Sequence, residues 1–236
     1  MRTSTKAAQA RGLARFGPLL VGLLFVGLAA TIVVLVVRLR ASPTWQVLPT
    51  SSASPVLVDG VAIDALDRAR LGDWMQTAKE LDTQAAQLSL QLREYLLCEV
   101  GPQTQLAGMK LPPAGDQSMR LVRGTVHVAL GSNFPGALRI YTDHALVEVR
   151  QGTCVIEVTA QGTRVGTLSE GVLHAANAQQ SALAAERASG LQPLAPRQGW
   201  RRLPSGAAEQ VVWSEVDERI LMQLGSQASE RWNRGL

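Results

Sequence analysis

The residues of this chain that are typical ligands of a structural zinc site are two cysteines and three histidines, and the two cysteines could also form a disulfide. His127, His144 and His174 are far apart in the sequence and no CxxC pair occurs, whereas structural zinc sites group their ligands at short spacings. The sequence therefore predicts no metal site. Two alternatives stay open for Cys98 and Cys154: a disulfide, or two small buried apolar side chains. The second is favoured, because a disulfide demands a short Cα separation that the sequence does not give.

The acidic residues form no catalytic pattern either. Asp64, Asp67 and Asp73 come nearest to an acidic cluster in the sequence, but they lie in an ordinary polar stretch where carboxylates are usually solvated. The chain contains no G-x-S-x-G elbow, no HExxH pair, no Walker A loop and no dinucleotide fingerprint. We therefore expect a protein that is not an enzyme and that uses no cofactor.

One long apolar segment determines the predicted membrane topology and hence the expected location of the rest of the chain. Residues 16–37 read FGPLLVGLLFVGLAATIVVLVV, without one ionisable side chain. At about 1.5 Å per residue, a helix of this length crosses the roughly 30 Å hydrocarbon layer. Four basic residues and no acidic one precede it, so residues 1–15 are expected to be a short cytoplasmic tail. A cleaved signal peptide is the alternative, but its apolar core is normally only about 7–15 residues long.

We accordingly expect a single-pass protein of a bacterial inner membrane, with its N-terminus in the cytoplasm and its C-terminal domain in the periplasm. The formal net charge of +4 would suggest nucleic acid as a partner. However, six of the 23 Lys and Arg residues, and none of the 19 Asp and Glu residues, lie in residues 1–40. The exported part is therefore close to neutral, and binding of nucleic acid is not expected.

Apolar residues alternate with polar ones through the middle of the chain, which indicates short β-strands. The alternation is clearest in residues 88–92, 121–130 and 138–158. Gly-Thr pairs recur within similar stretches but at irregular spacings, which is compatible with a β-sandwich or with stacked β-coils and falls short of a regular repeat. We expect residues 57–190 to form one β-rich domain.

Segments of different composition flank this domain. Residues 38–56 mix Pro, Ser and Thr and are expected to be an extended linker. Residues 191–210, rich in Pro, Gly and Arg, form either a second linker or a segment wrapped on the domain. Residues 211–236 predict a C-terminal helix whose apolar stripe, from Val216 to Leu224 and beyond, docks either on this domain or on a partner. The expected fold class is thus mainly β, with one N-terminal transmembrane helix, an extracytoplasmic sandwich-like or solenoid-like domain, and a C-terminal helix.

Several short motifs follow one another through the β-rich region in a distinctive order. They read G-D-x-x-x-T, L-x-x-G-x-V-x-V, T-x-x-A-x-V-x-V-x-G-T with one extra residue before its Gly-Thr, and a final G-T-x-V and E-G. Their residues here are Gly72, Asp73 and Thr77, then Gly124, then Thr142, Gly152 and Thr153, and last Glu170 and Gly171. In this order and spacing, residues 57–185 resemble the periplasmic domain of the FecR family of transmembrane regulators.

The resemblance implies a membrane-held β-domain that receives a signal from another envelope protein. Regulators of this family restrain a sigma factor through an N-terminal helical domain of many tens of residues, whereas residues 1–15 are too few to form a core. Direct inhibition of a sigma factor is therefore not expected. The sequence predicts a signalling or regulatory role through protein–protein contacts, with another envelope protein as partner. An envelope scaffold or adhesion module without signalling is the alternative, and the oligomeric state stays open.

Overall fold

The computed structural model describes residues 31, 45–48, 54–75, 78–92, 95–108, 117–134, 136–176, 191–205 and 207–234. By its contacts the chain divides into two units, Met1–Ser42 and Pro43–Leu236. The predicted transmembrane segment, residues 16–37, lies outside the described residues apart from the helical Thr31. Within the described ranges, no helix combines the length and the apolar composition that a membrane span requires.

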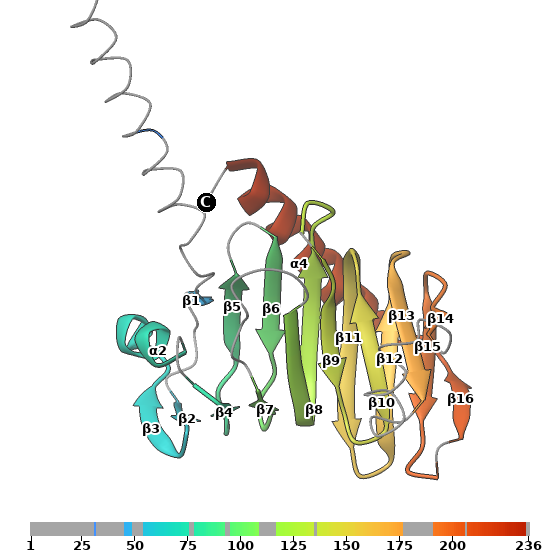
Figure 1. Cartoon of the computed structure of the whole chain (residues 1–236), viewed down its shortest axis with the longest axis horizontal. Coiled ribbons are helices and arrows are strands. Elements are labelled where there is room, and N and C mark those ends of the chain that lie inside the picture. Colours follow the sequence, from blue (N-terminus) through green and yellow to red (C-terminus); the bar gives the residue numbers. More distant parts are fainter. Residues whose placement is uncertain are drawn as a thin grey trace, which may run out of the picture. The chain divides into compact units, whose positions relative to one another are not determined.

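The described part of the second unit contains two β-sheets and the helices α2 and α4 (Figure 1), which confirms the predicted mainly β body and C-terminal helix. Sheet A contains, in spatial order, β1 (Trp45–Val47), β5 (Leu88–Leu92), β6 (Leu96–Val100), the second half of β8 (Gln117–Leu130), β11 (Gly152–Thr159), β12 (Gly162–Thr167), β15 (Gln198–Arg202) and β16 (Ala208–Val211). Sheet B contains β3 (Val61–Asp64), β2 (Pro55–Val58), β4 (Glu80–Asp82), β7 (Gln105–Ala107), the first half of β8, β9 (Leu138–Tyr141), β10 (Ala145–Val149), β13 (Val172–Ala176) and β14 (Gln192–Pro193). The helices are α2 (Arg68–Met75) and α4 (Glu215–Arg234).

Strand β8 belongs to both sheets. Its first half pairs with β7 and β9, and its second half pairs with β6 and β11. The change of sheet occurs at Gly124, which has a φ of 89°. A Cβ added there would lie 2.3–2.8 Å from atoms of Thr104, so the bend requires a residue without a side chain. This single strand therefore joins the two sheets into one body.

Alternate residues of both sheets point into the space between them and form one apolar core. On β5, Leu88, Leu90 and Leu92 are each at most 1% exposed and belong to this core, as their alternation with polar residues predicts. Full burial of a side chain of this kind contributes about 1.5–3 kcal/mol. The inner faces thus hold the fold together, and the outer faces remain for other contacts.

The predicted linkers depart from expectation, because parts of both add strands to the sheets. Residues 45–47 form β1 beside β5, and Trp45 is 3% exposed within the core. An indole gains more from burial against leucines than from an exposed linker position. Residues 192–193 and 198–202 likewise form β14 and β15, as in the wrapped alternative. Residues 208–211 then form the edge strand β16.

Helix α4 lies across the outer face of sheet A (Figure 1). Leu224 and Ala228 are fully buried and pack with Leu97 and Ala129 of the sheet. The predicted stripe is correct at these two helix positions, but Val216 is 54% exposed, so the first turn rotates its apolar residue away from the sheet. The apolar stripe of α4 thus packs on the helix's own domain, which is one of the two predicted alternatives.

Candidate functional site

The register of sheet A places polar side chains in one row across its outer face. Ser89 on β5 pairs with Glu99 on β6, and Glu99 pairs with His127 on β8. Leu48, just after β1, donates its backbone N–H to the Ser89 carbonyl oxygen at 2.8 Å. Because side chains in one such row lie on the same face, the four residues form a continuous strip beside α4.

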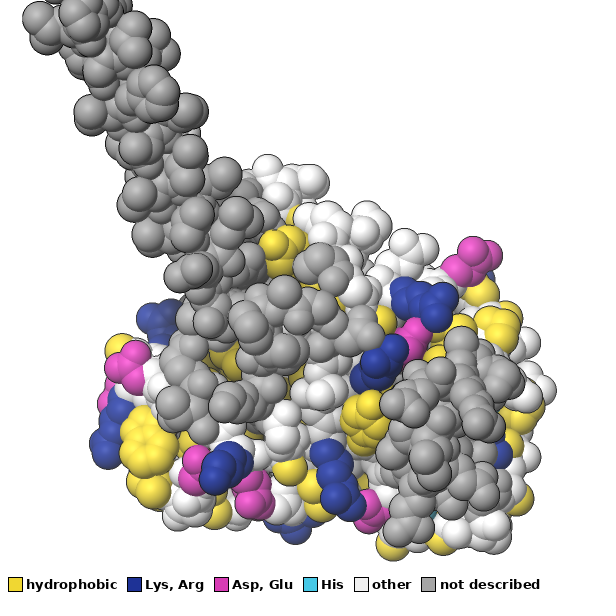
Figure 2. Space-filling view, in the orientation of Figure 1, with side chains coloured by type: hydrophobic (Ala, Val, Ile, Leu, Met, Phe, Trp, Pro, Cys, Tyr) yellow, Lys and Arg dark blue, Asp and Glu magenta, His cyan; other side chains and the backbone are white. Residues whose placement is uncertain are grey.

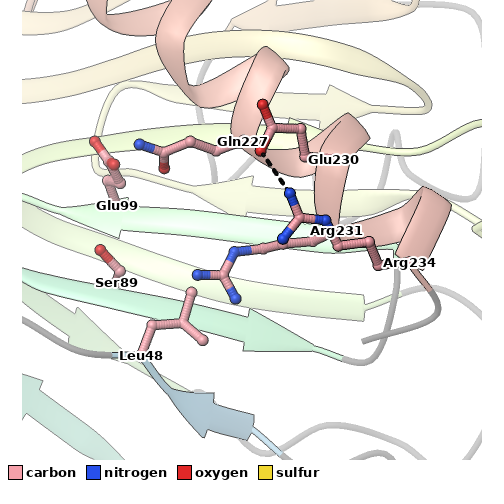
Figure 3. Close-up of a pocket in the computed structure, with 7 residues that line it drawn as sticks. All are labelled: Leu48, Ser89, Glu99, Gln227, Glu230, Arg231 and Arg234. Atoms are coloured by element: carbon pink, nitrogen blue, oxygen red, sulfur yellow. Dashed lines mark ion pairs between the residues drawn. The ribbon is translucent and has the colours of Figure 1, made fainter.

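A groove of about 460 Å³ lies between this strip and the C-terminal half of α4 (Figure 3). Leu48, Ser89 and Glu99 line it from the sheet, and Gln227, Glu230, Arg231 and Arg234 line it from the helix. Figure 3 shows the Arg231 side chain extending from α4 toward Ser89 and Leu48, whereas Glu99 lies at another part of the groove beside Gln227. The groove therefore presents an acid and a base at separate positions.

Glu99 and Arg231 lack partners of opposite charge in the described part of the chain. Burial raises the pKa of Glu99, because removing a carboxylate from water disfavours its charged form, and no described residue forms an ion pair or hydrogen bond with its side chain. Arg231 donates one hydrogen bond, from Nη1 to the neutral amide oxygen of Gln91 at 3.4 Å. The neighbouring Arg234 is instead paired with Glu230 at 3.5 Å.

The other end of α4 contrasts with this groove, because its charges are mutually satisfied. The Arg164 guanidinium on β12 contacts Asp217 of α4 through two nitrogens, at 2.5 and 3.3 Å, and Glu157 of β11 at 2.7 Å. The Arg164 and Asp217 side chains are 19% and 10% exposed. Burial lowers the pKa of the nearby His127, and the Asp217 charge acts in the opposite direction. This ion pair fixes the position of α4 on the sheet.

A second hollow, of about 740 Å³, lies where β8 changes sheets and offers no comparable pair of charges. Its Arg123 is bound to Asp82 at 2.7 Å, and its Glu157 is bound to Arg164. Figure 2 likewise shows basic and acidic side chains interspersed over the described part of the visible face. The groove beside α4 is therefore the stronger candidate for a binding site.

The structure places the two cysteines on either side of one residue. Cys98 on β6 and Cys154 on β11 both pair with Val128 on β8, so two strand spacings, roughly 9.6 Å, separate their Cα atoms. That exceeds the span of a disulfide, and both thiols are free. Burial raises the pKa of both thiols, that of Cys98 to about 12. They serve as small core residues, the favoured of the two alternatives.

Four of the family-motif residues meet at one corner of the body. Chain segments leave β10 and β12 there and cross between the sheets. Gly152 (φ 91°) and Gly171 (φ 95°) adopt left-handed backbone. The Thr153 N–H donates to Ser169 Oγ at 2.7 Å, and the Thr167 hydroxyl bonds to the Thr153 carbonyl at 2.8 Å. Glu170, between Ser169 and Gly171, is exposed. Apart from that carboxylate, the corner has a structural role.

Two further motif residues also stabilise the connections between the sheets. The buried Thr142 hydroxyl lies 2.8 Å from the Thr163 hydroxyl of β12 and accepts a hydrogen bond from the Ala145 N–H at 2.8 Å. It thereby ties the turn between β9 and β10, in sheet B, to sheet A. Gly124 supplies the bend in β8 described above.

Three motif residues, Gly72, Asp73 and Thr77, lie far from these corners in the sequence. Gly72 and Asp73 are part of α2, with Asp73 exposed, and Thr77 lies outside the described residues.

His174 stacks on Trp200 with ring centroids 5.7 Å apart, and its pKa is lowered by burial and by Arg202. Among the residues that the structure describes, no three His, Cys, Asp or Glu side chains gather as a metal site would require.

Sequence patterns do not single out the groove residues. Glu99 and Arg231 belong to no motif, and their proximity depends on the register of sheet A and on the docking of α4. A weak signal did exist, because Glu99 is a charged residue within the apolar strand LLCEV, residues 96–100. A charge in such a strand indicates the outer face, without indicating what covers it.

No family model matches this chain, and no curated protein matches it. Among solved structures, it is similar to two crystal structures, each of a proposed anti-sigma factor from Parabacteroides distasonis. Both are 10% identical in sequence, with TM-scores of 0.46 and 0.45. The similarity covers 61% and 60% of this chain and 64% of each of those chains, which is less than two thirds of their length. At this level it gives no information about the chemistry of the groove.

Proposed function

We propose that this protein is anchored in a bacterial inner membrane by residues 16–37 and acts without catalysis in envelope signalling or regulation. Its β-body lies in the periplasm and contacts another envelope protein. The apolar segment and its basic flank support the anchor. The ordered motifs that resemble those of FecR-family regulators support the regulatory role.

The observation that carries this proposal is a contrast between two sets of residues: the motif glycines have structural roles, whereas the groove beside α4 contains charges without ion-pair partners in the described part of the chain. Gly124, Gly152 and Gly171 adopt positive φ angles at tightly packed positions where the chain passes between the two sheets, so their role is structural. The groove beside α4 keeps a half-buried carboxylate and a guanidinium without ion-pair partners in the described part of the chain. A half-buried, unpaired charge destabilises a fold, so its presence favours a binding role. The groove is therefore the surface that we assign to the partner.

Deletion of the gene tests the regulatory role against its alternative. A regulator is expected to change the transcription of a defined set of genes when it is lost, and RNA sequencing would measure this change. Altered assembly of envelope structures with unchanged transcription would contradict the regulatory role and favour a scaffold or adhesion module.

Chromosomal point variants then test the role of the groove. The double variant Glu99→Gln with Arg231→Gln is expected to reproduce the transcriptional effect of the deletion, because both unpaired charges are lost. Arg219→Gln is the matched control, since Arg219 is also on α4 but exposed and outside the groove. Wild-type transcription in the double variant, at normal protein abundance, would contradict the assignment of the partner to this groove.

A further inference from the structure

We infer that the groove beside α4 binds an extended peptide segment of a partner protein that carries a basic and an acidic side chain two or three residues apart. This inference rests on the proposed function, and it names the chemistry that the partner must present. The basic side chain pairs with Glu99, and the acidic one pairs with Arg231.

The charges of the groove support an occupant with both signs. Glu99 is half-buried, and burial raises its pKa, so a cation brought beside it relieves the unfavourable burial of its charge. Among the described residues, Arg231 is bound by the neutral Gln91 amide alone, which leaves several guanidinium N–H groups available to bind a carboxylate in the bidentate geometry that arginine favours. Since Glu99 and Arg231 form no ion pair with each other, neither satisfies the other's charge.

The strand register sets the spacing of these charges. Leu48, Ser89 and Glu99 lie in one row across β1, β5 and β6, and the Arg231 side chain extends toward Leu48 and Ser89 (Figure 3). Arg231 Nη1 contacts Gln91, which lies two residues along β5 from the Ser89 that pairs with Glu99. One strand spacing of about 4.8 Å across and two residues of about 3.4 Å each along the strand, roughly 8 Å in all, therefore separate the two charged positions. An extended peptide covers that distance in two or three residues at about 3.3 Å per residue. Such a peptide would run obliquely over β5 and β6, beside the last turns of α4.

The size and composition of the groove also favour a peptide. Its volume of about 460 Å³ falls in the range of small ligand sites, and Ser89 and Gln227, which also line the groove, offer neutral hydrogen-bonding groups. The Leu48 side chain adds an apolar contact. These groups suit a polypeptide backbone, which needs donors and acceptors as well as charge recognition.

A displayed library of random heptapeptides, selected on the full chain in detergent micelles, tests the inference. We expect enriched sequences to carry Lys or Arg and Asp or Glu at a separation of two or three residues. Selection on Glu99→Gln is expected to lose the basic preference alone, and selection on Arg231→Gln to lose the acidic preference alone. For one enriched peptide, replacing its basic residue by Gln should weaken binding to the wild type about five- to tenfold and leave binding to Glu99→Gln unchanged.

Arg219→Gln is the control variant, and it is expected to select the same sequences as the wild type. Circular dichroism would verify that each variant is folded. Absence of charge enrichment, or the same enrichment on all variants, would overturn the inference. Equal competition by a free lysine–aspartate mixture would also overturn it, since the occupant would then be a small zwitterion. Each of these outcomes leaves the transcriptional test of the proposed function intact, so the two proposals fail separately.

Discussion

Replacing Gly152 by alanine tests whether the motif glycines are structural. Gly152 has a φ of 91°, and a Cβ there would lie 1.9 Å from Ser169 Oγ and 2.7 Å from Ser169 Cβ. The Ser169 hydroxyl cannot simply rotate away without loss, because it accepts the Thr153 N–H at 2.7 Å. The substitution therefore combines backbone strain, a steric clash and a weakened hydrogen bond.

These three contributions set the expected loss of stability. A left-handed backbone costs a residue with a Cβ about 1–2 kcal/mol, overpacking costs about 1–3 kcal/mol, and a lost hydrogen bond costs about 1 kcal/mol. We expect a total near 4 kcal/mol. For a body of this size, that corresponds to a decrease in Tm of roughly 8–16 °C.

Gly60→Ala is the matched control, because Gly60 also has a positive φ of 79° but no atom within 4 Å of its added Cβ. Only the backbone term applies there, so we expect a decrease in Tm of roughly 2–8 °C. The assay is thermal unfolding of the full chain in detergent, followed by far-ultraviolet circular dichroism. Adding Ser169→Gly to Gly152→Ala is expected to restore part of the loss. Equal Tm values for the Gly152 and Gly60 variants would refute the corner as described.

Three other predictions follow from the charges and thiols of the body. Asp217→Asn leaves the part-buried Arg164 without its ionised partner on α4, and we expect it to lower the free energy of unfolding in denaturant by about 2 kcal/mol. The control Glu230→Gln breaks an exposed ion pair and should lower it by less than about 0.5 kcal/mol. Equal losses for the two variants would contradict the role of Asp217 in docking α4. The Cys98 thiol, with a pKa raised to about 12 by burial, should react with a maleimide only after unfolding in urea, and rapid labelling of the native protein would place it outside the core. Burial raises the pKa of Glu99 in the folded state, so its contribution to stability is present below the unfolded pKa and is lost as pH rises through the folded pKa. Glu99→Gln should therefore gain stability relative to wild type as pH rises above 4.5, the ordinary pKa of a glutamate. A pH-independent difference would indicate that Glu99 is fully solvated.

The sequence predicts the parts of this fold that depend on local pattern. The alternation in residues 88–92 and the Gly-Thr pairs at strand starts are local signals, and the structure places Leu90 in the core and Gly152 at a sheet crossing. The C-terminal helix is predictable for the same reason. Its first turn differs from the expected stripe, because the apolar Val216 fits a helical stripe equally well whether or not a neighbouring segment covers it.

The features that were not predictable depend on contacts between distant segments. Nothing near Cys98 or Cys154 shows that Val128 lies between them, since that depends on the register of three strands. Trp45 lies in a segment of linker composition, and it is buried because β1 pairs with the edge of β5 that no other described strand covers. The meeting of Glu99 with α4 likewise requires tertiary docking, which sequence periodicity does not specify.

Cysteine labelling in cells tests the central claim, a body held outside the cytoplasm, most directly. The native thiols are at most 1% exposed, so they should stay silent, and a single exposed cysteine can report location. We expect Gln161→Cys, in the exposed turn between β11 and β12, to react with a membrane-impermeant maleimide on intact spheroplasts while the protein remains in the membrane fraction. Ser4→Cys, in the predicted cytoplasmic tail, should react only after lysis. Labelling of Gln161→Cys only after lysis would contradict the account.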